Sequence, residues 1–294
     1  MTPANDAPLR PAALAAGLIA AAAVAVPLSD ARGQDLLERA RETGGVTIGY
    51  ANQPPYGFTT PDGGLTGEAP EIARIILSKM GIEWIEAVVT DYASLIPGLK
   101  EGRFDIIAAG MVVVPARCAE VLFSEPFHGV SEAFLVRAGN PEGLNTFEDV
   151  AASEDAIVAV TAGAVEGEYA RRAGVPEERI LVVPDPEAGA AAVEAGQADA
   201  LALTSPALRE ILRMRGAGSG LEAGEPFTTA AGEPVSGHGA FVFRKEDAAF
   251  AAEFNRHLEA FIGSEGHLAL IEPFGLTEAD LPEKTTEELC RPVS

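Results

Sequence analysis

The amino-acid sequence predicts an α/β fold of two lobes, each a mainly parallel sheet flanked by helices, joined by two hinge strands. Three observations predict it. Short apolar strands alternate with amphipathic helices, which favours right-handed crossovers and parallel pairing. The alternation occurs twice, with a similar phrase in each half. Two extended segments that contain glycine, residues 127–136 and 235–243, interrupt it.

Residues 1–31 are predicted to be a signal peptide. Arg10 supplies a positive start, an apolar run covers residues 12–26, Pro27 ends it, and residues 29–31 offer small side chains for cleavage. Such a run is too short to span a bilayer comfortably, although a short membrane anchor or a buried helix is the alternative. No cysteine follows the run directly, which argues against a lipid anchor. We therefore expect an exported, periplasmic protein.

The elements of the first half follow in order. A strand is expected over residues 45–51 and a loop over 52–58, because Pro54 and Pro55 cannot continue a ladder. An amphipathic helix over 68–80 has Pro70 in its first turn and Gly81 as its stop. Two further strands are expected over 82–89 and 104–109.

The second half repeats the pattern. Strands are expected over residues 157–161, 180–183 and 200–203, and helices over 164–173, 187–195 and 206–215. The phrase LKEGRFDIIAAG aligns with VEAGQADALALT, so that Asp105 matches Asp199, and both are expected to make turn hydrogen bonds. A unit that occurs only twice favours two similar lobes over a solenoid.

The two extended segments predict the domain organisation. Two crossings make lobe 2 an insertion, residues 133–235, within lobe 1, residues 34–129 and 238–294. The helix expected over 248–262 and the C-terminal tail then rejoin lobe 1. Two lobes joined by two strands can open and close around a ligand.

Composition limits the partners and the compartment. The formal charge of -23 disfavours nucleic acid and anionic lipid. Two cysteines, Cys118 and Cys290, favour a disulfide in an oxidising compartment, with two unpaired thiols as the alternative. The four histidines show no metal-ligand spacing with either cysteine, so we expect no metal and no cofactor.

Residues 90–118 carry the strongest functional signal. Their pattern predicts a helix, a glycine stop, a buried strand and a turn that presents Arg117. A guanidinium just beyond a strand end suits a two-pronged hydrogen bond to a carboxylate. The stretch therefore predicts a site for a small anionic or zwitterionic solute. A surface ion pair of Arg117 with Glu120 or Asp91 is the alternative.

Five phrases together point to one family: LTGEAPEIA, SLIPGLKEGRFDIIAAGM, AGAVEG, GAFVFRKED and KTTEELC. With them the chain resembles the periplasmic solute-binding proteins of ABC importers, in the polar amino acid group called family 3. Within that group it is most similar to ectoine- and hydroxyectoine-binding proteins, over nearly all of the chain after the leader. The resemblance implies the type II periplasmic-binding fold and an ABC permease as partner.

The resemblance also implies a carboxylate clamp and an aromatic cage. Arg117 would hold the ligand carboxylate, and Tyr56 and Tyr92 fall on cage positions, with rim or core packing as the alternative for each tyrosine. A loop that leads into a helix start would add free backbone N–H groups, which favour an anion. That loop consists of Gly163, Ala164 and Val165.

Three positions depart from the family pattern. Ordinary amino-acid binders place an aspartate where Thr204 stands, which favours a delocalised ligand cation such as the amidinium of ectoine. Close ectoine binders place a glutamate where Gln53 stands and an aromatic ring where Val112 stands. Loss of the glutamate would weaken binding of a ligand cation by about 1.5–3 kcal/mol, the value of a buried charge-assisted hydrogen bond. Loss of the aromatic ring would cost on the order of 1–2 kcal/mol, the value of one cation–π contact. Compensation could come from Glu68, Glu166 or Phe58.

The sequence therefore predicts a binding protein, and no enzyme, that captures a small zwitterionic carboxylate, ectoine-like, and delivers it to the permease. One alternative is a binder of another amino acid or cyclic zwitterion. A second is an exported dehydratase of cyclohexadienyl acids, with Glu166 as its acid. A third is a detached sensor domain of a membrane receptor. A monomer is the default for a protein that docks on a permease.

Overall fold

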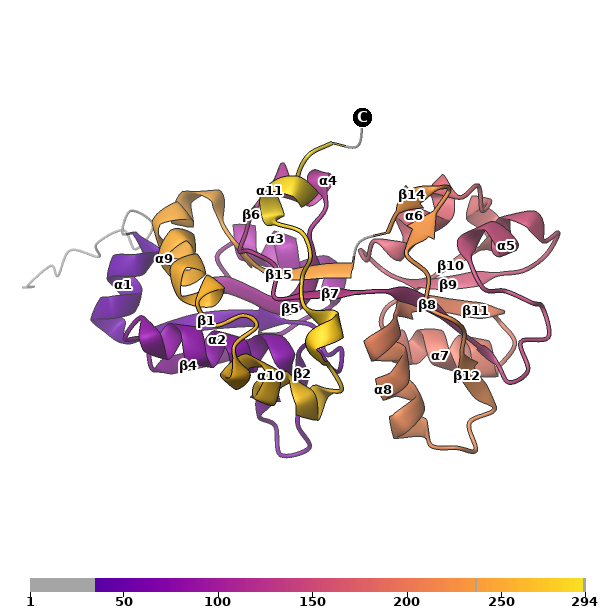
Figure 1. Ribbon diagram of the computed structural model, residues 1–294, viewed down its shortest axis with the longest axis horizontal. Helices are drawn as coiled ribbons and strands as arrows, with labels where there is room; N and C mark the ends of the chain where they lie inside the picture. The colour runs from indigo at the N-terminus through magenta and orange to yellow at the C-terminus, as the bar shows by residue number, and fades with distance from the viewer. Residues whose placement is uncertain (1–34, 236, 293–294) are drawn as a thin grey trace, which may run out of the picture. The chain divides into compact units, whose positions relative to one another are not determined.

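The computed structural model describes residues 35–235 and 237–292, which contain two mixed sheets with helices against both faces of each (Figure 1). The predicted signal peptide, residues 1–31, lies outside the described residues. Within the described part, no helix has both the length and the apolar character that a membrane crossing requires. The two-lobe α/β fold predicted from the sequence is confirmed.

The first sheet has the strand order β4-β1-β5-β15-β6, with β7 paired to β15. Its elements before the first crossing are α1 (Leu36–Thr43), β1 (Gly45–Tyr50), β2 (Phe58–Thr59), β3 (Leu65–Thr66), α2 (Glu68–Lys79), β4 (Trp84–Val89), α3 (Leu95–Lys100), β5 (Ile106–Val112), α4 (Pro115–Cys118), β6 (Leu122–Phe123) and β7 (His128–Val130). After the second crossing follow β15 (Gly237–Phe243), α9 (Ala248–Glu259), α10 (Glu265–Ile271) and α11 (Thr286–Leu289).

The second sheet has the order β10-β9-β11-β8-β12. Its lobe contains β8 (Glu132–Arg137), α5 (Phe147–Ala152), β9 (Val158–Thr161), α6 (Glu166–Arg172), β10 (Ile180–Val183), α7 (Pro186–Glu194), β11 (Ala200–Thr204), α8 (Ser205–Arg215), β12 (Leu221–Ala223), β13 (Thr229–Ala230) and β14 (Glu233–Pro234). In both sheets the strands that are connected through helices pair in parallel. The strands β8 and β15, which adjoin the passages between the lobes, pair antiparallel with their neighbours.

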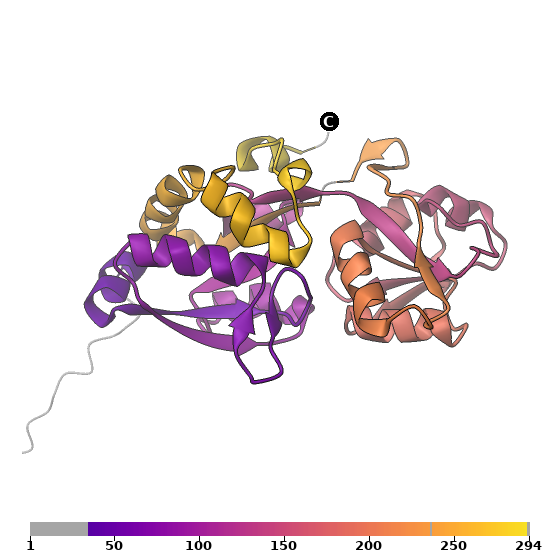
Figure 2. The same ribbon diagram turned by 60° about the horizontal axis from the view of Figure 1, so that its bottom comes forward.

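Side chains alternate between the two faces of each central strand, as the pleat requires. In β5, Ile106 and Ala108 enter the core under α2 and α9, whereas Ile107 and Met111 enter the core under α3. In β11, Leu201 and its neighbours of the same parity pack toward α7 and α8. Both faces are therefore covered by helices, and α2 lies beside α10 in lobe 1 (Figure 2). A strand buried on both faces explains the continuous apolar runs in the sequence.

The two crossings lie side by side. β7 pairs antiparallel with β15, with Val130 opposite Gly237 and Gly129 opposite His238. Glu132, two residues after β7, already belongs to the second sheet, where it lies opposite Thr204. The chain thus passes from one sheet to the other along two adjacent strands (Figure 1). We retain lobe 1 as residues 34–129 and 238–294 and lobe 2 as 133–235 as a proposal.

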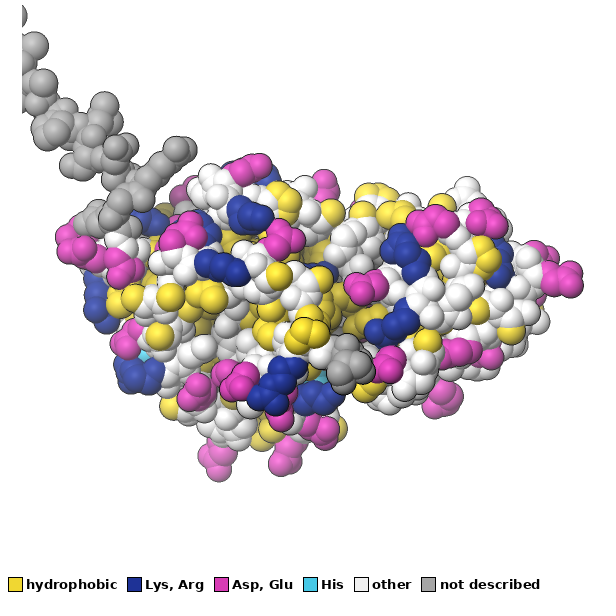
Figure 3. Space-filling model, turned by 90° about the horizontal axis from the view of Figure 1, so that it is seen from above, with side chains coloured by type: hydrophobic (Ala, Val, Ile, Leu, Met, Phe, Trp, Pro, Cys, Tyr) yellow, Lys and Arg dark blue, Asp and Glu magenta, His cyan; other side chains and the backbone are white. Residues whose placement is uncertain are grey.

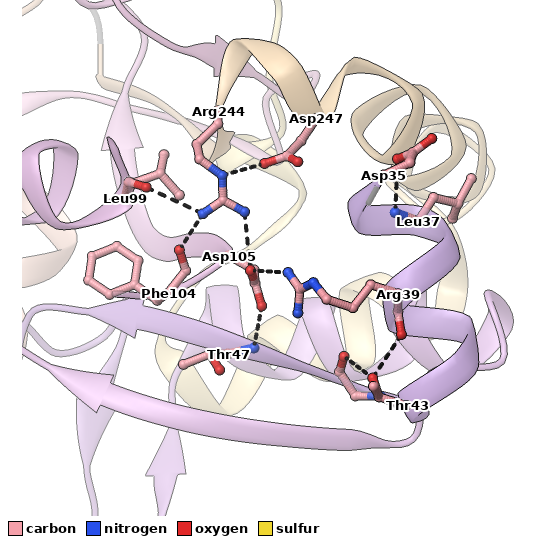
Figure 4. Close-up of polar contacts among 11 residues, drawn as sticks. Asp35, Leu37, Arg39, Thr43, Thr47, Leu99, Phe104, Asp105, Arg244 and Asp247 are labelled. Carbon is pink, nitrogen blue, oxygen red and sulfur yellow. Dashed lines mark hydrogen bonds and ion pairs between the residues drawn. The ribbon is translucent and has the colours of Figure 1, made fainter. Parts of the chain in front are cut away.

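The repeated aspartate occupies equivalent places in the two lobes. Asp105 accepts a hydrogen bond from the backbone N–H of Thr47 at 3.0 Å and ion pairs from Arg39 at 2.6 Å and Arg244 at 3.1 Å (Figure 4). Asp199 accepts one from the N–H of Ile157 at 3.0 Å and pairs with Arg137 at 2.9 Å. Each aspartate therefore joins the start of a neighbouring strand to the rest of its lobe. The expected hydrogen bonding is present, but it extends well beyond a local turn.

Cys118 and Cys290 form a disulfide across 172 residues of sequence. The bond joins α11 to α4, the short helix that carries Arg117 (Figure 1). Thr286 at the start of α11 donates its backbone N–H to Glu125 at 3.0 Å. The C-terminal segment is therefore attached to lobe 1, as the predicted pairing implied.

Several local predictions differ from the structure. Arg117 lies on the short helix α4, because Pro115 at its first position begins a helical turn where the sequence suggested an open turn. The helix expected from residue 164 begins at Glu166. β5 continues to Val112, beyond the expected end at 109, because it pairs with β15 there. The sequence prediction did not include α1, the β2–β3 hairpin, α5, α10 or α11.

The surface combines a large acidic excess with scattered basic groups. On the face shown in Figure 3, lysine and arginine side chains are interspersed with aspartate and glutamate. Several of these are exposed ion pairs, such as Lys100 with Glu120 at 2.8 Å. Such pairs contribute little to stability.

Candidate functional site

A small cavity lies where residues of the two lobes meet. Its volume is about 20 Å³, about the space of one water molecule. Lobe 1 contributes Gln53, Tyr56, Tyr92, Ala109, Gly110, Val112 and His128, and lobe 2 contributes Ala164, Val165, Glu166 and Thr204. An outer groove of about 920 Å³ shares Gln53 and Tyr92 with it. The structure thus brings together residues that lie up to about 150 positions apart in the sequence.

Arg117 bridges the two lobes beside this cavity. Its Nη1 donates to the carbonyl of Val112 at 2.8 Å, and its Nη2 donates to the carbonyl of Gly163 in lobe 2 at 2.8 Å. The guanidinium also lies over the ring of Tyr92, 5.7 Å from its centroid. Among residues 35–235 and 237–292, no carboxylate lies within ion-pair distance of Arg117. The alternative of a surface pair with Glu120 or Asp91 is therefore not what the structure shows.

The loop before α6 approaches lobe 1 closely at Gly163. This glycine has φ +76°, and a Cβ built on it would lie 2.8 Å from the Cα of Ala93. A larger residue would strain both the backbone and the contact between the lobes. The N–H of Ala164 donates to Thr161 at 3.1 Å, so it is occupied within the turn. Of the free backbone N–H groups that the sequence predicted over residues 163–165, that of Ala164 is therefore not available to a ligand.

Tyr56 forms the second polar link between the lobes. Its side chain is 3% exposed and its hydroxyl donates to Oγ1 of Thr204 at 2.7 Å. Burial raises the pKa of Tyr56 well above its usual value, so the hydroxyl keeps its proton and remains a donor. Gly110, with φ +61°, lies behind the ring, where a Cβ would come within 3.0 Å of Tyr56.

A buried hydrogen-bonded pair of side chains supports Tyr56 from lobe 1. Nδ1 of His128 lies 2.7 Å from Oε2 of Glu68, and the two side chains are 2% and 0% exposed. The His128 ring packs 4.8 Å from the Tyr56 ring. The sequence suggested Glu68 only as a residue that could compensate for the carboxylate missing at Gln53, and it indicated no binding role for His128. Only the fold brings the two together.

Two glutamates, at the starts of β8 and α6, are buried near each other. Glu132 is 0% exposed and Glu166 is 4% exposed. Burial, and then the negative charge of Glu166, raise the pKa of Glu132 well above its usual value. Burial raises the pKa of Glu166 to about 7, against smaller lowering effects of its own backbone N–H and of Arg117. Sequence reasoning missed Glu132, although a lone glutamate in the extended run FHGVSEAFLV was the available signal.

These two carboxyls predict a specific dependence of stability on pH. Glu166 holds its proton in the folded state up to about pH 7 but loses it near its usual value of 4.5 in the unfolded chain. The folded state therefore binds more protons in this window, and its stability falls as pH rises, by up to about 1.4 kcal/mol per pH unit for each group. For Glu166 the fall is absent below about pH 4.5 and complete above about pH 7.

Thermal melting of the wild type and of Glu166→Gln between pH 5 and pH 8 checks this expectation. The neutral amide removes the titration, so the variant should gain stability relative to the wild type as pH rises. Using the difference between the two proteins cancels the titration of exposed carboxylates such as Glu120, whose pKa is lowered by Lys100. A constant difference across the range would contradict the assignment.

Comparison with known proteins gives three concordant findings. Residues 46–274 match the model of the bacterial extracellular solute-binding proteins, family 3. A probable amino-acid ABC transporter periplasmic-binding protein of Sinorhizobium fredii is 37% identical over 287 residues, 94% of each chain. The crystal structure of EhuB in complex with hydroxyectoine has 33% identity and a TM-score of 0.81, covering 87% of this chain and 98% of that one.

A more distant structure shares the fold. The ancestral amino acid-binding protein AncCDT-1, described as a precursor of cyclohexadienyl dehydratase, has 24% identity and a TM-score of 0.70. It covers 81% of this chain and 98% of the ancestral chain. This likeness supports the two-lobe architecture alone.

Proposed function

The chain belongs to the bacterial extracellular solute-binding proteins of family 3, and on this premise we propose that it captures a small zwitterionic carboxylate outside the cytoplasm and delivers it to an ABC permease. The ligand that we propose is ectoine-like. The observation that carries the proposal is the position of Arg117, whose Nη1 bonds within lobe 1 and whose Nη2 reaches the carbonyl of Gly163 in lobe 2. The likeness to a hydroxyectoine-binding protein supports the ligand class.

The geometry suggests how capture would proceed. Polar links cross between the lobes at the cavity, from Arg117 to Gly163 and from Tyr56 to Thr204, and a weaker one joins Arg209 to the carbonyl of Gly275 at 3.5 Å. A cavity of about 20 Å³ cannot hold a solute of several heavy atoms, so the lobes must separate to admit it. A ligand carboxylate would then replace the carbonyl of Gly163 as acceptor for Arg117, in a bidentate, charge-assisted pair. Ligand contacts to both lobes would favour the closed state.

The positively charged part of the ligand would lie against the rings of Tyr56 and Tyr92, the two proposed cage residues. The Arg117 guanidinium lies 5.7 Å from the centroid of the Tyr92 ring, which supports a role for this ring beside a cation. Gln53 and Val112 line the same cavity and would contact the ligand as an amide and an apolar wall.

We propose a periplasmic monomer, with residues 1–31 as a cleaved signal peptide. N-terminal sequencing of the exported protein would identify the cleavage site.

Calorimetric titration tests the ligand assignment. The panel consists of ectoine, hydroxyectoine, L-arginine, L-glutamine and glycine betaine. We expect ectoine or hydroxyectoine to bind more tightly than either amino acid. Binding of an amino acid without binding of either ectoine would reject the ectoine-like ligand while leaving the binding-protein assignment in place. A chain that binds no member of the panel would reject the zwitterion class.

One observation favours testing an enzymatic alternative. Glu166 is buried at the cavity with a pKa of about 7, which suits a general acid. An exported dehydratase of cyclohexadienyl acids would use such a group. Incubation of the purified protein with prephenate and arogenate decides it, and we expect no turnover above that of Glu166→Gln.

A further inference from the structure

The wall of lobe 2 presents several buried polar atoms that no described group satisfies. Both carboxyl oxygens of Glu132, Oε2 of Glu166, Oγ1 of Thr161 and Oγ of Ser205 lack a hydrogen-bond partner within the described residues. Thr161 ends β9 and Ser205 directly follows β11, so these atoms gather at the carboxyl edge of the parallel strands. In α/β sheets this edge is where ligands bind.

Glu132 lies on the same face of the sheet as the cavity. It is directly opposite Thr204 in the antiparallel β8–β11 ladder, and opposed residues direct their side chains to the same face. The hydroxyl of Thr204 points from that face into contact with Tyr56 across the lobes. The charge of Glu132 acts on both Tyr56 and Glu166. Glu166 therefore lines the cavity, and Glu132 lies just behind the lining, close enough for its charge to act on two lining residues, Glu166 and Tyr56.

The buried carboxyls at this corner have no partner within the described part of the chain that would stabilise their charged forms. Glu68 is paired with His128, and Arg117 directs its two terminal nitrogens at carbonyl groups. Glu132 and Glu166 have no ion-pair partner among residues 35–235 and 237–292. An unpartnered buried carboxyl is costly, so two of them at a binding cavity call for a cationic ligand group.

We propose that Glu132 and Glu166 form the subsite for the ligand's cation, and that this subsite selects cations that carry N–H donors. An amidinium, a guanidinium or a primary ammonium can donate to both carboxyls, whereas a quaternary ammonium cannot donate to either. This inference rests on the proposed function. The two glutamates, on β8 and α6, would supply the negative charge that Gln53 and Thr204 lack.

The subsite links binding to proton release. Burial raises the pKa of both carboxyls, and the charge of Glu166 raises that of Glu132 further. A ligand cation favours their charged forms, so its arrival releases a proton near neutral pH. The charged and titratable groups facing the pair are Arg117, Tyr56 and Tyr92, with the Glu68–His128 pair and Asp280 behind Tyr56. Of these, Arg117 favours the charged forms in the absence of ligand as well.

The test titrates the same five-member panel into the wild type, Glu132→Gln and Glu166→Gln at pH 7, in two buffers of different ionisation enthalpy. The relevant ligand is the ectoine or amino acid that the wild type binds. We expect each amide substitution to raise the Kd of that ligand by about ten- to a hundredfold, because one charge-assisted hydrogen bond is lost. We expect proton release with the wild type and less with each variant. Glycine betaine should bind far more weakly than that ligand. Glu168→Gln is the matched control, exposed in the same helix, and should change nothing.

The outcomes separate this inference from the proposed function. If the wild type binds none of the panel, the proposed function and this subsite both fail. If it binds a zwitterion and both variants stay within about twofold of it, the subsite alone is wrong, since one charge-assisted bond is worth about tenfold or more. Glycine betaine binding as tightly as ectoine would also overturn it. Proton release by the wild type requires no variant, so a misfolded variant does not block the test.

Discussion

Replacing Arg117 by alanine is expected to abolish measurable binding of a carboxylate ligand, with an increase in Kd of about a hundredfold to several thousandfold. The side chain supplies two charge-assisted donors at the boundary between the lobes. Removing one partner of a desolvated charge pair costs about 3–5 kcal/mol, because the other charge remains buried. Calorimetry with the ligand identified from the panel measures the change.

Two variants control for the position and the charge. Arg117→Lys keeps the charge but loses the planar fork, so we expect an intermediate loss. Arg213→Ala removes an equal charge from the outer groove, where Arg213 pairs with Glu210 at 2.6 Å and is exposed. It should leave the affinity within about twofold, in line with the small value of an exposed pair. Unchanged affinity of Arg117→Ala would refute the carboxylate clamp.

Replacing Asp105 by alanine is expected to lower the free energy of unfolding by about 3 kcal/mol, as breaking a buried ion pair does. Its carboxylate is 10% exposed and holds three groups together: the N–H of Thr47, Arg39 and Arg244 (Figure 4). Arg244 keeps Asp247 at 2.7 Å, but Arg39 and the Thr47 N–H lose their partner. Thermal and urea unfolding followed by circular dichroism measure the loss.

Asp199→Ala is the matched control in lobe 2. Asp199 occupies the same place in the repeat, but its side chain is 21% exposed and it pairs with Arg137 alone, which is 32% exposed. Better hydration of the remaining groups should reduce the cost to about 1–2 kcal/mol. An equal loss in the two lobes would contradict the role of burial and of the second arginine.

The fold was largely predictable because its determinants are local. Period-two and helical apolar patterns, glycine stops and the repeated phrase around Asp105 and Asp199 each arise within about twelve residues of sequence. The missed elements, such as α5 and the β2–β3 hairpin, are short, and their stability comes from packing against the rest of each lobe. The antiparallel pairs of β8 and β15 join segments far apart in the chain, which no local pattern specifies.

The candidate site was predictable where the family resemblance marked single positions. Arg117, Tyr56, Tyr92 and Thr204 meet at one cavity or beside it, and their binding roles remain predictions. The acids were not predictable in the same way. Glu132 lies in a crossing strand whose register with β11 decides which face it occupies, and a shift of one residue would turn it away.

By itself the sequence determined the two lobes, the disulfide partners and the residue that is suited to hold a carboxylate. The tertiary structure alone decided the charge around that residue. It paired Glu68 with His128, occupied Arg117 with two carbonyls, and left Glu132 and Glu166 buried at the same corner. The physical reason is that the protonation and pairing of a carboxyl depend on its burial and on nearby charges, and both are set by segments distant in sequence that meet only in the folded structure.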